Sequence, residues 1–494
     1  MAAATDGPYG PTKQIRGKTM TTKTYDAIVI GGGPGGYVAG IRLGQLKQKT
    51  LVIEKESWGG VCLNWGCIPS KALIAAANFA ERARTQAATM GVNVQGVTID
   101  SGKMQDWKNG IVKKLTTGVQ GLVKANGAEL MKGTARFVDA KTLEVETAEG
   151  VQRVTATKGI IVSTGARVME LPTLKIDGKK VISAKEGVSL HPLPKRLAII
   201  GGGIIGMELG GVYSKLGVEV TIIEFLPSVL ASMDADLAAP AIKHMEKAGV
   251  KFLTNAKATG YTESPDGSLK LSLDVKGETK TVDTDVILLA VGFRPNTEGL
   301  GLEKVGVALD KRGHIAIDDQ CRTNVPGIYA IGDVAGMPYL AHKASKEGEV
   351  AAEVIAGHHS ARDWKAMPAA TFTHPEIASV GLFEHEAKAK GIEYTVGKFP
   401  FAASGRAMAV METDGFVKVI AEKTGPDKKD AKIIGVHIVG PEASDLISEG
   451  ALALEMDAFV EDVGLTIHPH PTLGETVMEA AKAAIGEAVH ILNR

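Results

Sequence analysis

One pattern occurs twice in the chain, and it restricts the fold more than any other feature. A short apolar segment leads into a glycine-rich turn, a helix-like stretch and a second apolar segment that ends on a glutamate. The number of positions between the first glycine and the final glutamate is the same in both copies. The copies are Tyr25–Ile30, Gly31–Gly36 and Thr50–Glu54, and then Arg196–Ile200, Gly201–Gly206 and Val218–Glu224. The sequence therefore predicts an α/β fold with two similar strand–helix–strand units.

The glycines of each turn match the fingerprint of a dinucleotide-binding site. A single match is weak evidence, but each copy here follows a strand, precedes a helix and is followed about 20 residues later by an acid. The first glycine permits the tight turn, the second lets the backbone approach a pyrophosphate, and the third lets the helix pack on the strand. The three positions are Gly31, Gly33 and Gly36 in one copy and Gly201, Gly203 and Gly206 in the other.

The acids at the ends of the second strands indicate which dinucleotides bind. Glu54 and Glu224 can accept hydrogen bonds from ribose hydroxyls, and a carboxylate repels a 2′-phosphate. No basic residue lies within three positions of Glu224, so the second site is expected to prefer NAD to NADP. Two dinucleotides in one chain suggest electron transfer between them, with FAD held permanently and NAD exchanging. The two motifs alone do not say which copy holds FAD.

Length and composition set broader limits. A chain of 494 residues is too long for one core and predicts three or four domains. The formal net charge is zero and no apolar run is long enough to span a membrane, so neither nucleic acid nor membrane is an expected partner. Residues 72–130 are predicted to be helical, 131–165 and 250–292 to form strands, and the part after about 366 to be mixed, with strands near Gly415–Glu422 and Ile433–Val439.

Two of the three cysteines lie close together, shortly after Glu54. Cys62 and Cys67 are separated by four residues, and if the segment were helical their sulfurs would be about one turn apart, close enough for a disulfide. A zinc site usually needs four ligands and no second cysteine pair exists, so no metal site is expected. A buried structural thiol pair remains as an alternative, but a redox pair beside the first dinucleotide fits the spacing best.

Two further motifs contain reactive groups. One is a predicted strand that ends in Gly332-Asp333, where a carboxylate could reach sugar hydroxyls, although a plain turn aspartate would look the same. The other is the segment His468–Glu475, in which Glu475 follows His470 by five residues. A dithiol reaction needs a base to form the thiolate, and a histidine oriented by a carboxylate suits that task. A loop with structural histidines is the alternative.

Together, these motifs in this order resemble the pyridine nucleotide–disulfide oxidoreductases, specifically the branch that oxidises dihydrolipoamide. The resemblance covers the chain from about Thr22 to Arg494. It implies two Rossmann-like dinucleotide-binding domains plus an α+β C-terminal dimerisation domain. The expected parts are 1–21, a disordered extension; 22–167, the FAD-binding domain; 168–292, the NAD-binding domain; 293–365, a central domain completing the FAD site; and 366–494, the interface domain.

The resemblance also implies roles for individual residues. Cys62 is expected to meet the substrate and Cys67 the flavin, while His470, oriented by Glu475, acts as the base from the partner subunit of a homodimer. Lys71 would lie near the flavin and pair with Glu208. Asp333 and the backbone at Ala341 and His342 would bind FAD, and Gly292 would border NAD. Two residues depart from the usual cysteine motif, Val61 and Trp65, and Trp65 is expected to influence the redox pair because it lies between the cysteines.

The implied activity is oxidation of dihydrolipoamide with reduction of NAD. The expected partners are the lipoyl domains of 2-oxoacid dehydrogenase or glycine-cleavage complexes. The expected compartment is the cytoplasm, or the mitochondrial matrix if the basic N-terminal segment is a transit peptide. The alternative enzyme is a glutathione-type reductase running in the reductive direction, which Glu224 disfavours. A binding or scaffold protein on the same fold is a further alternative, but it would be expected to have lost Cys62, Cys67 or His470.

Overall fold

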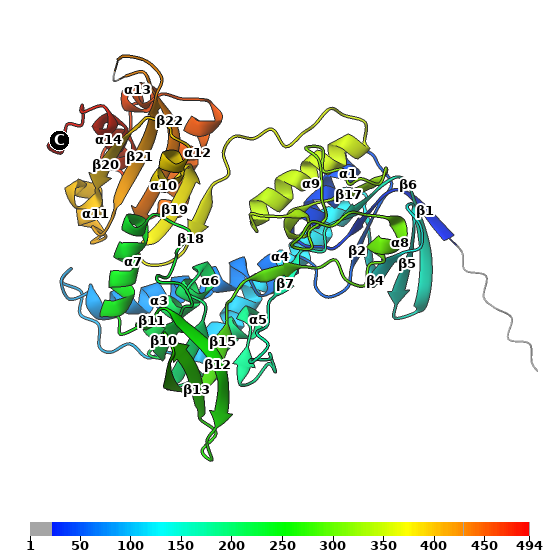
Figure 1. Ribbon diagram of the computed structural model, residues 1–494, viewed down its shortest axis with the longest axis horizontal. Coiled ribbons are helices and arrows are strands. Elements are labelled where there is room, and N and C mark those ends of the chain that lie inside the picture. Colours follow the sequence, from blue (N-terminus) through cyan, green and yellow to red (C-terminus); the bar gives the residue numbers. More distant parts are fainter. Residues whose placement is uncertain (1–21, 428, 494) are drawn as a thin grey trace, which may run out of the picture.

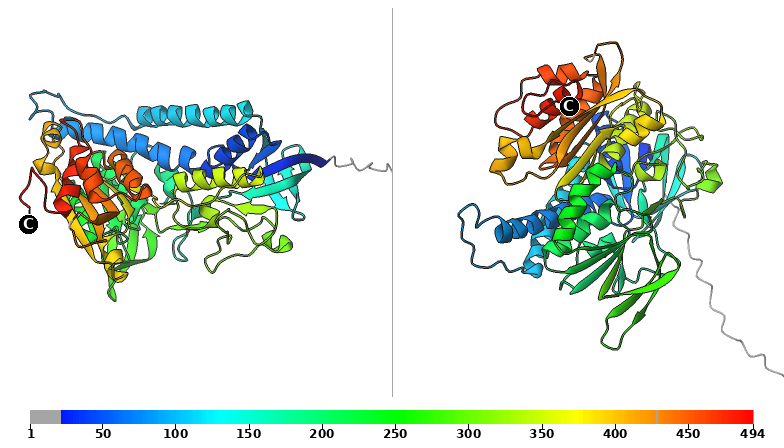
Figure 2. Two further views of the ribbon diagram at one scale, coloured as in Figure 1. Left: turned by 90° about the horizontal axis from the view of Figure 1, so that it is seen from above. Right: turned by 60° about the vertical axis from the view of Figure 1, so that its left-hand side comes forward.

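The computed structural model describes residues 22–427 and 429–493, so the expected extension over residues 1–21 lies outside the described residues. Two sheets with parallel strands and one antiparallel sheet, each with its neighbouring helices, form three bodies (Figure 1). They are called the first body, the second body and the C-terminal body, in the order of their sheets. The first sheet lies at one end of the molecule, and the second and third lie together at the other end (Figures 1 and 2). This arrangement agrees with the predicted α/β class with an added α+β part.

The first sheet has the order β3-β2-β1-β6-β5-β4, and β17 pairs with β6. Its central strands are parallel, whereas β4, β5 and β6 form an antiparallel extension, as predicted for most of residues 131–165. The strands are β1 (Thr22–Ile30), β2 (Thr50–Glu54), β3 (Glu129–Lys132), β4 (Thr134–Phe137), β5 (Thr142–Thr147), β6 (Gly150–Val162) and β17 (Ile328–Ala330). Helix α1 (Pro34–Gln45) connects β1 to β2.

Two long helices and a returning segment complete the first body. Helices α3 (Cys67–Thr85) and α4 (Ser101–Ala125) occupy most of the predicted helical stretch. They run side by side along one side of the molecule (Figure 2). Much later in the chain, β17 adds to the first sheet and α9 (Ala341–Ile355) packs against α1. Residues far apart in the sequence therefore meet at the glycine turn after β1.

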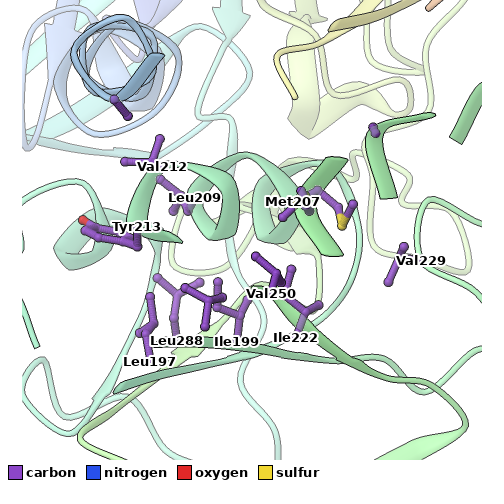
Figure 3. Close-up of a cluster of buried hydrophobic side chains, with 14 of the residues drawn as sticks. Leu197, Ile199, Met207, Leu209, Val212, Tyr213, Ile222, Val229, Val250 and Leu288 are labelled. Atoms are coloured by element: carbon purple, nitrogen blue, oxygen red, sulfur yellow. The ribbon is translucent and has the colours of Figure 1, made fainter. Parts of the chain in front are cut away.

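The second sheet is fully parallel, with the order β11-β10-β9-β15-β8. Its strands are β8 (Val181–Ile182), β9 (Arg196–Ile200), β10 (Glu219–Ile223), β11 (Lys251–Leu253) and β15 (Val286–Leu289). Helix α6 (Ile204–Lys215) buries an apolar face on this sheet, where Met207, Leu209 and Val212 lie over Ile199, Ile222 and Leu288 (Figure 3). Burial of such aliphatic side chains contributes about 1.5–3 kcal/mol each, so it fixes the helix on the sheet.

Smaller elements surround the second sheet. They are α5 (Ala184–Gly187), α7 (Ala235–Lys247), the antiparallel strands β12 (Ala256–Glu263), β13 (Leu269–Val275) and β14 (Glu278–Thr284), and the pair β7 (Ala166–Val168) and β16 (Phe293–Pro295). The short helix α8 (Leu302–Val305) and the 3₁₀ turn η1 (Gly332–Ala335) follow later in the chain.

The C-terminal body is an antiparallel sheet with helices, reached by an extended segment after α9 (Figure 1). Its strand order is β18-β19-β22-β21-β20. The elements are β18 (Ala369–Thr371), β19 (Glu376–Gly381), α10 (Glu384–Ala389), β20 (Tyr394–Pro400), η2 (Phe401–Ala403), α11 (Gly405–Ala409), β21 (Phe416–Lys423), β22 (Ala431–Gly440), α12 (Ala443–Glu455), α13 (Val460–Leu465) and α14 (Glu475–Ala484). Helix α7 packs on β19 and β22, which joins this body to the second sheet. Among the described helices, none combines the length and apolarity that crossing a bilayer requires.

Candidate active site

Two short helical pieces carry the cysteines, so the segment between them is not one continuous helix. Cys62 lies in α2 (Gly60–Asn64), and Cys67 is the first residue of α3. The break falls at Trp65 and Gly66, whose backbone angles are not helical. The break nevertheless leaves the two sulfurs within hydrogen-bond reach of each other.

The two thiols are electrostatically different. The hydrogen bond donated by the Cys62 thiol, the nearby Lys71 ammonium and the backbone N–H at the start of α3 lower the pKa of Cys67 to about 7, against the opposing effect of burial. The pKa of Cys62 is raised because its proton is shared with Cys67 and because it is buried. Cys67 is therefore the sulfur that holds negative charge in the reduced pair.

The cysteine segment packs directly on the first glycine turn. A Cβ built on Gly60 would lie 2.7 Å from the Cα of Gly33, so only glycine permits this approach. Asn64 fixes the segment by donating its side-chain N–H to the carbonyl oxygens of Trp58 and Gly60 at 3.0 and 2.8 Å. The cysteines are thus adjacent to the first dinucleotide-type turn in space as well as in sequence.

Tyr37 is a neighbour of the cysteines that the sequence did not reveal. Its pKa is raised by burial and by the negative charges of Cys62 and Cys67, so the phenol lies within electrostatic range of the pair. The residue belongs to α1, immediately after the glycine turn. Helix α1 therefore contributes both its N-terminus and a side chain to the surroundings of the thiols.

The two glycine turns have the same geometry. Gly31 and Gly201 each have φ of +110°, a conformation that glycine adopts at little cost. A Cβ on Gly36 or Gly206 would overlap the carbonyl oxygen of Gly31 or Gly201, respectively, which explains the third glycine of each fingerprint.

The middle glycines, Gly33 and Gly203, precede α1 and α6. A Cβ on Gly203 would meet nothing within 4 Å, and one on Gly33 would meet only the Cα of Gly60, at 3.8 Å. The space in front of each helix N-terminus therefore suits a pyrophosphate.

The glutamates that end β2 and follow β10 are anchored in parallel ways. The carboxylate of Glu54 accepts the N–H of Gly32 at 2.7 Å, and that of Glu224 accepts the N–H of Gly202 at the same distance. Glu54 is buried, whereas Glu224 is partly exposed and also accepts the N–H of Leu226. Each carboxylate is held at the edge of its glycine turn, in a position that suits ribose hydroxyls.

Asp333 lies in the turn between β17 and α9, beside the first sheet. Burial raises its pKa to about 6, although Lys343 opposes the shift. Lys343 donates to the carbonyl oxygens of Gly332 and Gly336, and the buried Glu347 accepts the N–H of Gly332 at 2.7 Å. The turn that presents Asp333 is therefore held by a buried ion pair that the sequence did not reveal.

The N-terminus of α9 follows that turn. Ala341 is the first residue of α9, and the ring Nε2 of His342 donates to the carbonyl oxygen of Pro368, with an N–O distance of 2.8 Å. The backbone N–H groups of the first helical turn have no intrahelical acceptor, so they are available to a ligand. The imidazole of His342 points instead to the segment that leads to the C-terminal body.

Lys71 and Glu208 form an ion pair between α3 and α6, with 2.8 Å between the ammonium nitrogen and the carboxylate oxygen. The other oxygen of Glu208 accepts the backbone N–H of Phe372 at 2.8 Å. The Phe372 ring lies under the Lys71 ammonium, 4.2 Å from it. Glu208 therefore ties together the cysteine helix, the second sheet and the C-terminal body, and Phe372 is a member of this group that the sequence did not indicate.

Trp65 does not lie between the two sulfurs, so that prediction is wrong in its geometry. Its ring packs against the core of the second body and is covered by the Lys185 ammonium at 4.3 Å. Lys185 also pairs with Glu56. Val61 is exposed.

Gly292 lies just after β15, with φ of +110°. Its carbonyl oxygen accepts the N–H of Met169. Ala290, two residues before Gly292, approaches the Gly201 turn so closely that a Cβ on Gly201 would lie 2.4 Å from the Ala290 carbonyl oxygen. Gly292 is thus at the carboxyl edge of the second sheet, near the second glycine turn.

His470 and Glu475 are close to each other, with 2.8 Å between Nδ1 and Oε1. Glu475 also accepts the N–H of Thr472, and this bond and the imidazole lower the pKa of its carboxyl group despite the cost of burial. The His470 side chain is 82% exposed. Helix α14 lies on the outer side of the C-terminal body, away from the first sheet (Figures 1 and 2). One chain therefore does not bring His470 to its own cysteines.

Comparison with protein families gives two matches. The model of the pyridine nucleotide-disulphide oxidoreductases matches residues 25–348, and the model of the dimerisation domain of the same family matches residues 367–481. The first range contains both glycine turns, the cysteine pair and Asp333, and the second contains His470 and Glu475.

Curated relatives match nearly the whole chain. Dihydrolipoyl dehydrogenase of Geobacillus stearothermophilus is 50% identical over 95% of this chain and 98% of its own length. Dihydrolipoyl dehydrogenase of Halobacterium salinarum is 46% identical over 95% and 98%. Mitochondrial dihydrolipoyl dehydrogenase 1 of Arabidopsis thaliana is 43% identical over 94% and 91%. Among solved structures, LpdA of Mycobacterium tuberculosis matches with a TM-score of 0.85 and 28% identity, over 92% of this chain and 99% of its own.

Proposed function

The chain belongs to the pyridine nucleotide-disulphide oxidoreductase family and has dihydrolipoyl dehydrogenase activity with FAD and NAD, and we propose how its own residues divide that reaction. The observation that carries the proposal is the position of Cys62 and Cys67 on the first glycine turn, with a lowered pKa at Cys67. A cysteine pair in which one thiol has a lowered pKa, packed on a dinucleotide-type turn, suits electron transfer from a substrate dithiol.

We assign the first body to FAD and the second to NAD. Residues 22–167 and 293–365 would hold FAD through Gly31, Gly33, Gly36, Glu54, Asp333 and the N–H groups at Ala341 and His342. Residues 168–292 would hold NAD through Gly201, Gly203, Gly206, Glu224 and Gly292. Bound FAD supplies a two-electron acceptor that NAD can reoxidise.

The substrate half-reaction begins at the C-terminal body. His470 of the partner subunit, oriented by Glu475, takes a proton from one thiol of dihydrolipoamide, and the resulting thiolate attacks Cys62 of the Cys62–Cys67 disulfide. The disulfide breaks and Cys67 leaves as a thiolate, which its low pKa favours. The second substrate thiol then displaces Cys62, which releases the cyclic disulfide and leaves the reduced cysteine pair.

The remaining step returns the cysteines to the disulfide. Cys67 carries the negative charge, and Lys71 stabilises that charge through its ammonium group. Glu208 holds Lys71 in place from the opposite side. We propose that this arrangement directs the electron pair from the Cys67 sulfur toward the flavin rather than back to the substrate.

The chain carries a dimerisation domain, and a homodimer explains why His470 is exposed and distant from the cysteines of its own chain. We propose that the physiological substrates are lipoyl domains of 2-oxoacid dehydrogenase or glycine-cleavage complexes. A redox dithiol and only three cysteines suit a reducing compartment, so we propose the cytoplasm or the mitochondrial matrix.

Steady-state kinetics with matched substrates tests this proposal. Dihydrolipoamide with NAD should be turned over with kcat/KM far above that of dihydrolipoamide with NADP. Glutathione disulfide with NADPH should give at most about one hundredth of that rate, which is the discrimination expected of a site built for one partner. Comparable rates with glutathione disulfide and NADPH would instead favour a reductase running in the opposite direction.

A further inference from the structure

Three side chains from three bodies of the fold converge at a place remote from the cysteines. Glu81 lies on α3, His244 on α7, and His374 in the turn between β18 and β19. One ligand atom from each of the three lies within 4.8 Å of the others. All three side chains are partly buried, and their positions in the sequence are too far apart for any spacing motif to reveal them.

The side chains of this cluster pair with one another and with neighbouring charged groups. Oε1 of Glu81 lies 3.3 Å from Nε2 of His244, whereas Oε2 pairs with Lys215 at 2.9 Å. His374 pairs through Nε2 with Glu412 at 3.2 Å. A carboxylate that bonds a histidine ring in this way is a frequent companion of metal-binding histidines, because it orients the imidazole.

A small cavity of about 10 Å³ adjoins the two histidines. Its lining also includes Asn78, Lys215 and Thr373. That volume is close to the space needed by a single water molecule. The cavity can therefore admit one small species, and the polar side chains of Asn78, Lys215 and Thr373 in its largely apolar lining could bond a water ligand.

The carboxylates Glu81 and Glu412 and the ammonium group of Lys215 surround the two histidines. Glu81 pairs with His244 and Lys215, and Glu412 pairs with His374. Lys215 is shared between Glu81 and the side-chain oxygen of Asn78, so it does not occupy the space between the histidines.

We propose that Glu81, His244 and His374 bind one zinc ion, with a water from the cavity as the fourth ligand. Two imidazole nitrogens and a carboxylate oxygen are ligands that zinc accepts at about 2.0–2.2 Å in tetrahedral geometry. Ligand atoms in such a tetrahedron lie about 3.3–3.5 Å apart, and the Glu81–His244 separation already meets this distance. The ion would link α3, α7 and the turn before β19, and its role would be structural.

The test measures zinc retained by the oxidised holoenzyme, in which the redox cysteines form a disulfide and do not compete for the ion. After equilibration with zinc and gel filtration, the wild-type protein should retain about one zinc per chain. His244→Gln and His374→Gln should each lower the affinity at least about tenfold. His385→Gln is the control, because His385 is an exposed histidine paired with Asp234 outside the cluster.

Equal zinc binding by the wild type and both cluster variants would overturn the proposal, as would absence of binding to the wild type. FAD content verifies that each variant is folded, since FAD binds in the first body. Zinc should raise the melting temperature of the wild type and of His385→Gln but not of the cluster variants. Because these readouts do not use dihydrolipoamide turnover, they remain valid whatever substrate the enzyme prefers.

A further variant tests whether the Lys215 ammonium competes with zinc for the Glu81 carboxylate. Lys215→Met removes the competing charge while keeping much of the side-chain volume, so zinc should bind at least about tenfold more tightly. Unchanged or weaker zinc binding in this variant would contradict the assignment of Glu81 as a ligand.

Discussion

Lys71 and Glu208 lie 2.8 Å apart and join the helix that begins at Cys67 to the second parallel sheet. Lys71 also contributes to the low pKa of Cys67, so the pair connects the electrostatics of the redox centre to the packing of the domains. The backbone N–H of Phe372, in the C-terminal body, donates a hydrogen bond to the other carboxylate oxygen of Glu208. A single buried carboxylate is thus shared by three parts of the chain.

Replacement of Glu208 by Gln should weaken this junction. Gln can still accept the Phe372 N–H, but the half-buried Lys71 ammonium loses its counterion. We expect a loss of about 1–3 kcal/mol in stability, less than for a fully buried pair because Lys71 is partly exposed, together with reduced kcat. Thermal unfolding and steady-state kinetics measure both effects. Stability and kcat equal to the wild type would show that the pair has no such role.

The titration of Cys67 should be visible in the reduced enzyme. The thiolate fraction should rise as the pH increases through about 7, the pKa of Cys67, and reach a plateau above it. Lys71→Gln removes a positive charge that favours the thiolate, so the midpoint should move to higher pH. Thiolate absorbance in the ultraviolet measures this midpoint, with Lys185→Gln as a control lysine that contacts Trp65 instead. A midpoint that does not move in Lys71→Gln would exclude Lys71 as a stabilising charge.

Glu475 should matter for turnover and not for cofactor binding. Glu475→Gln keeps a hydrogen-bond acceptor for His470 but removes the charge that stabilises the protonated imidazole. We expect kcat with dihydrolipoamide to fall about 100-fold or more, the usual contribution of a positioned base. Glu449→Gln, which alters the partner of His468, is the matched control and should retain most activity. Similar activities of the two variants would remove Glu475 from the mechanism.

The third glycines of the two turns offer a paired test of cofactor assignment. A methyl group at Gly36 or Gly206 would overlap a backbone carbonyl, so the helix must move away from its strand. Gly36→Ala should therefore lose FAD, whereas Gly206→Ala should retain FAD and show a raised KM for NAD. Flavin absorbance of the purified variants and NAD kinetics distinguish the two. Loss of FAD from Gly206→Ala but not from Gly36→Ala would reverse the assignment.

Glu224 should set the choice between NAD and NADP. Glu224→Arg replaces the carboxylate that repels a 2′-phosphate with a group that attracts it, so the ratio of kcat/KM for NADP to that for NAD should rise at least about tenfold. Glu219→Arg, at an exposed position on β10, the strand that Glu224 follows, controls for added positive charge. An unchanged ratio in Glu224→Arg would show that another residue selects the cofactor.

Local patterns predicted the parts of the site that depend on neighbouring residues. The glycine turns, their terminal glutamates and the adjacency of the cysteines to the first turn all follow from short-range sequence, because a strand, a turn and a helix position those atoms directly. The sequence left open whether Cys62 and Cys67 share one helix; the structure places them in two helices separated at Trp65 and Gly66, and Trp65 packs against the second body.

Features built from distant segments were not predictable in this way. The ion pair of Lys343 and Glu347 that holds the Asp333 turn depends on how α9 returns to the first sheet. Phe372 reaches Glu208 only because the C-terminal body packs against α6. Periodicity and spacing carry no information on such contacts, since each depends on the relative placement of whole domains.

The central claim is that electrons from dihydrolipoamide pass through the Cys62–Cys67 pair before they reach the flavin. Anaerobic mixing of the enzyme with dihydrolipoamide, without NAD, tests it through the flavin absorbance. The wild type should show a rapid absorbance change, and Cys67→Ser with FAD still bound should show none. A change of equal rate and size in Cys67→Ser would contradict the account, because the flavin would then receive electrons without the cysteine pair.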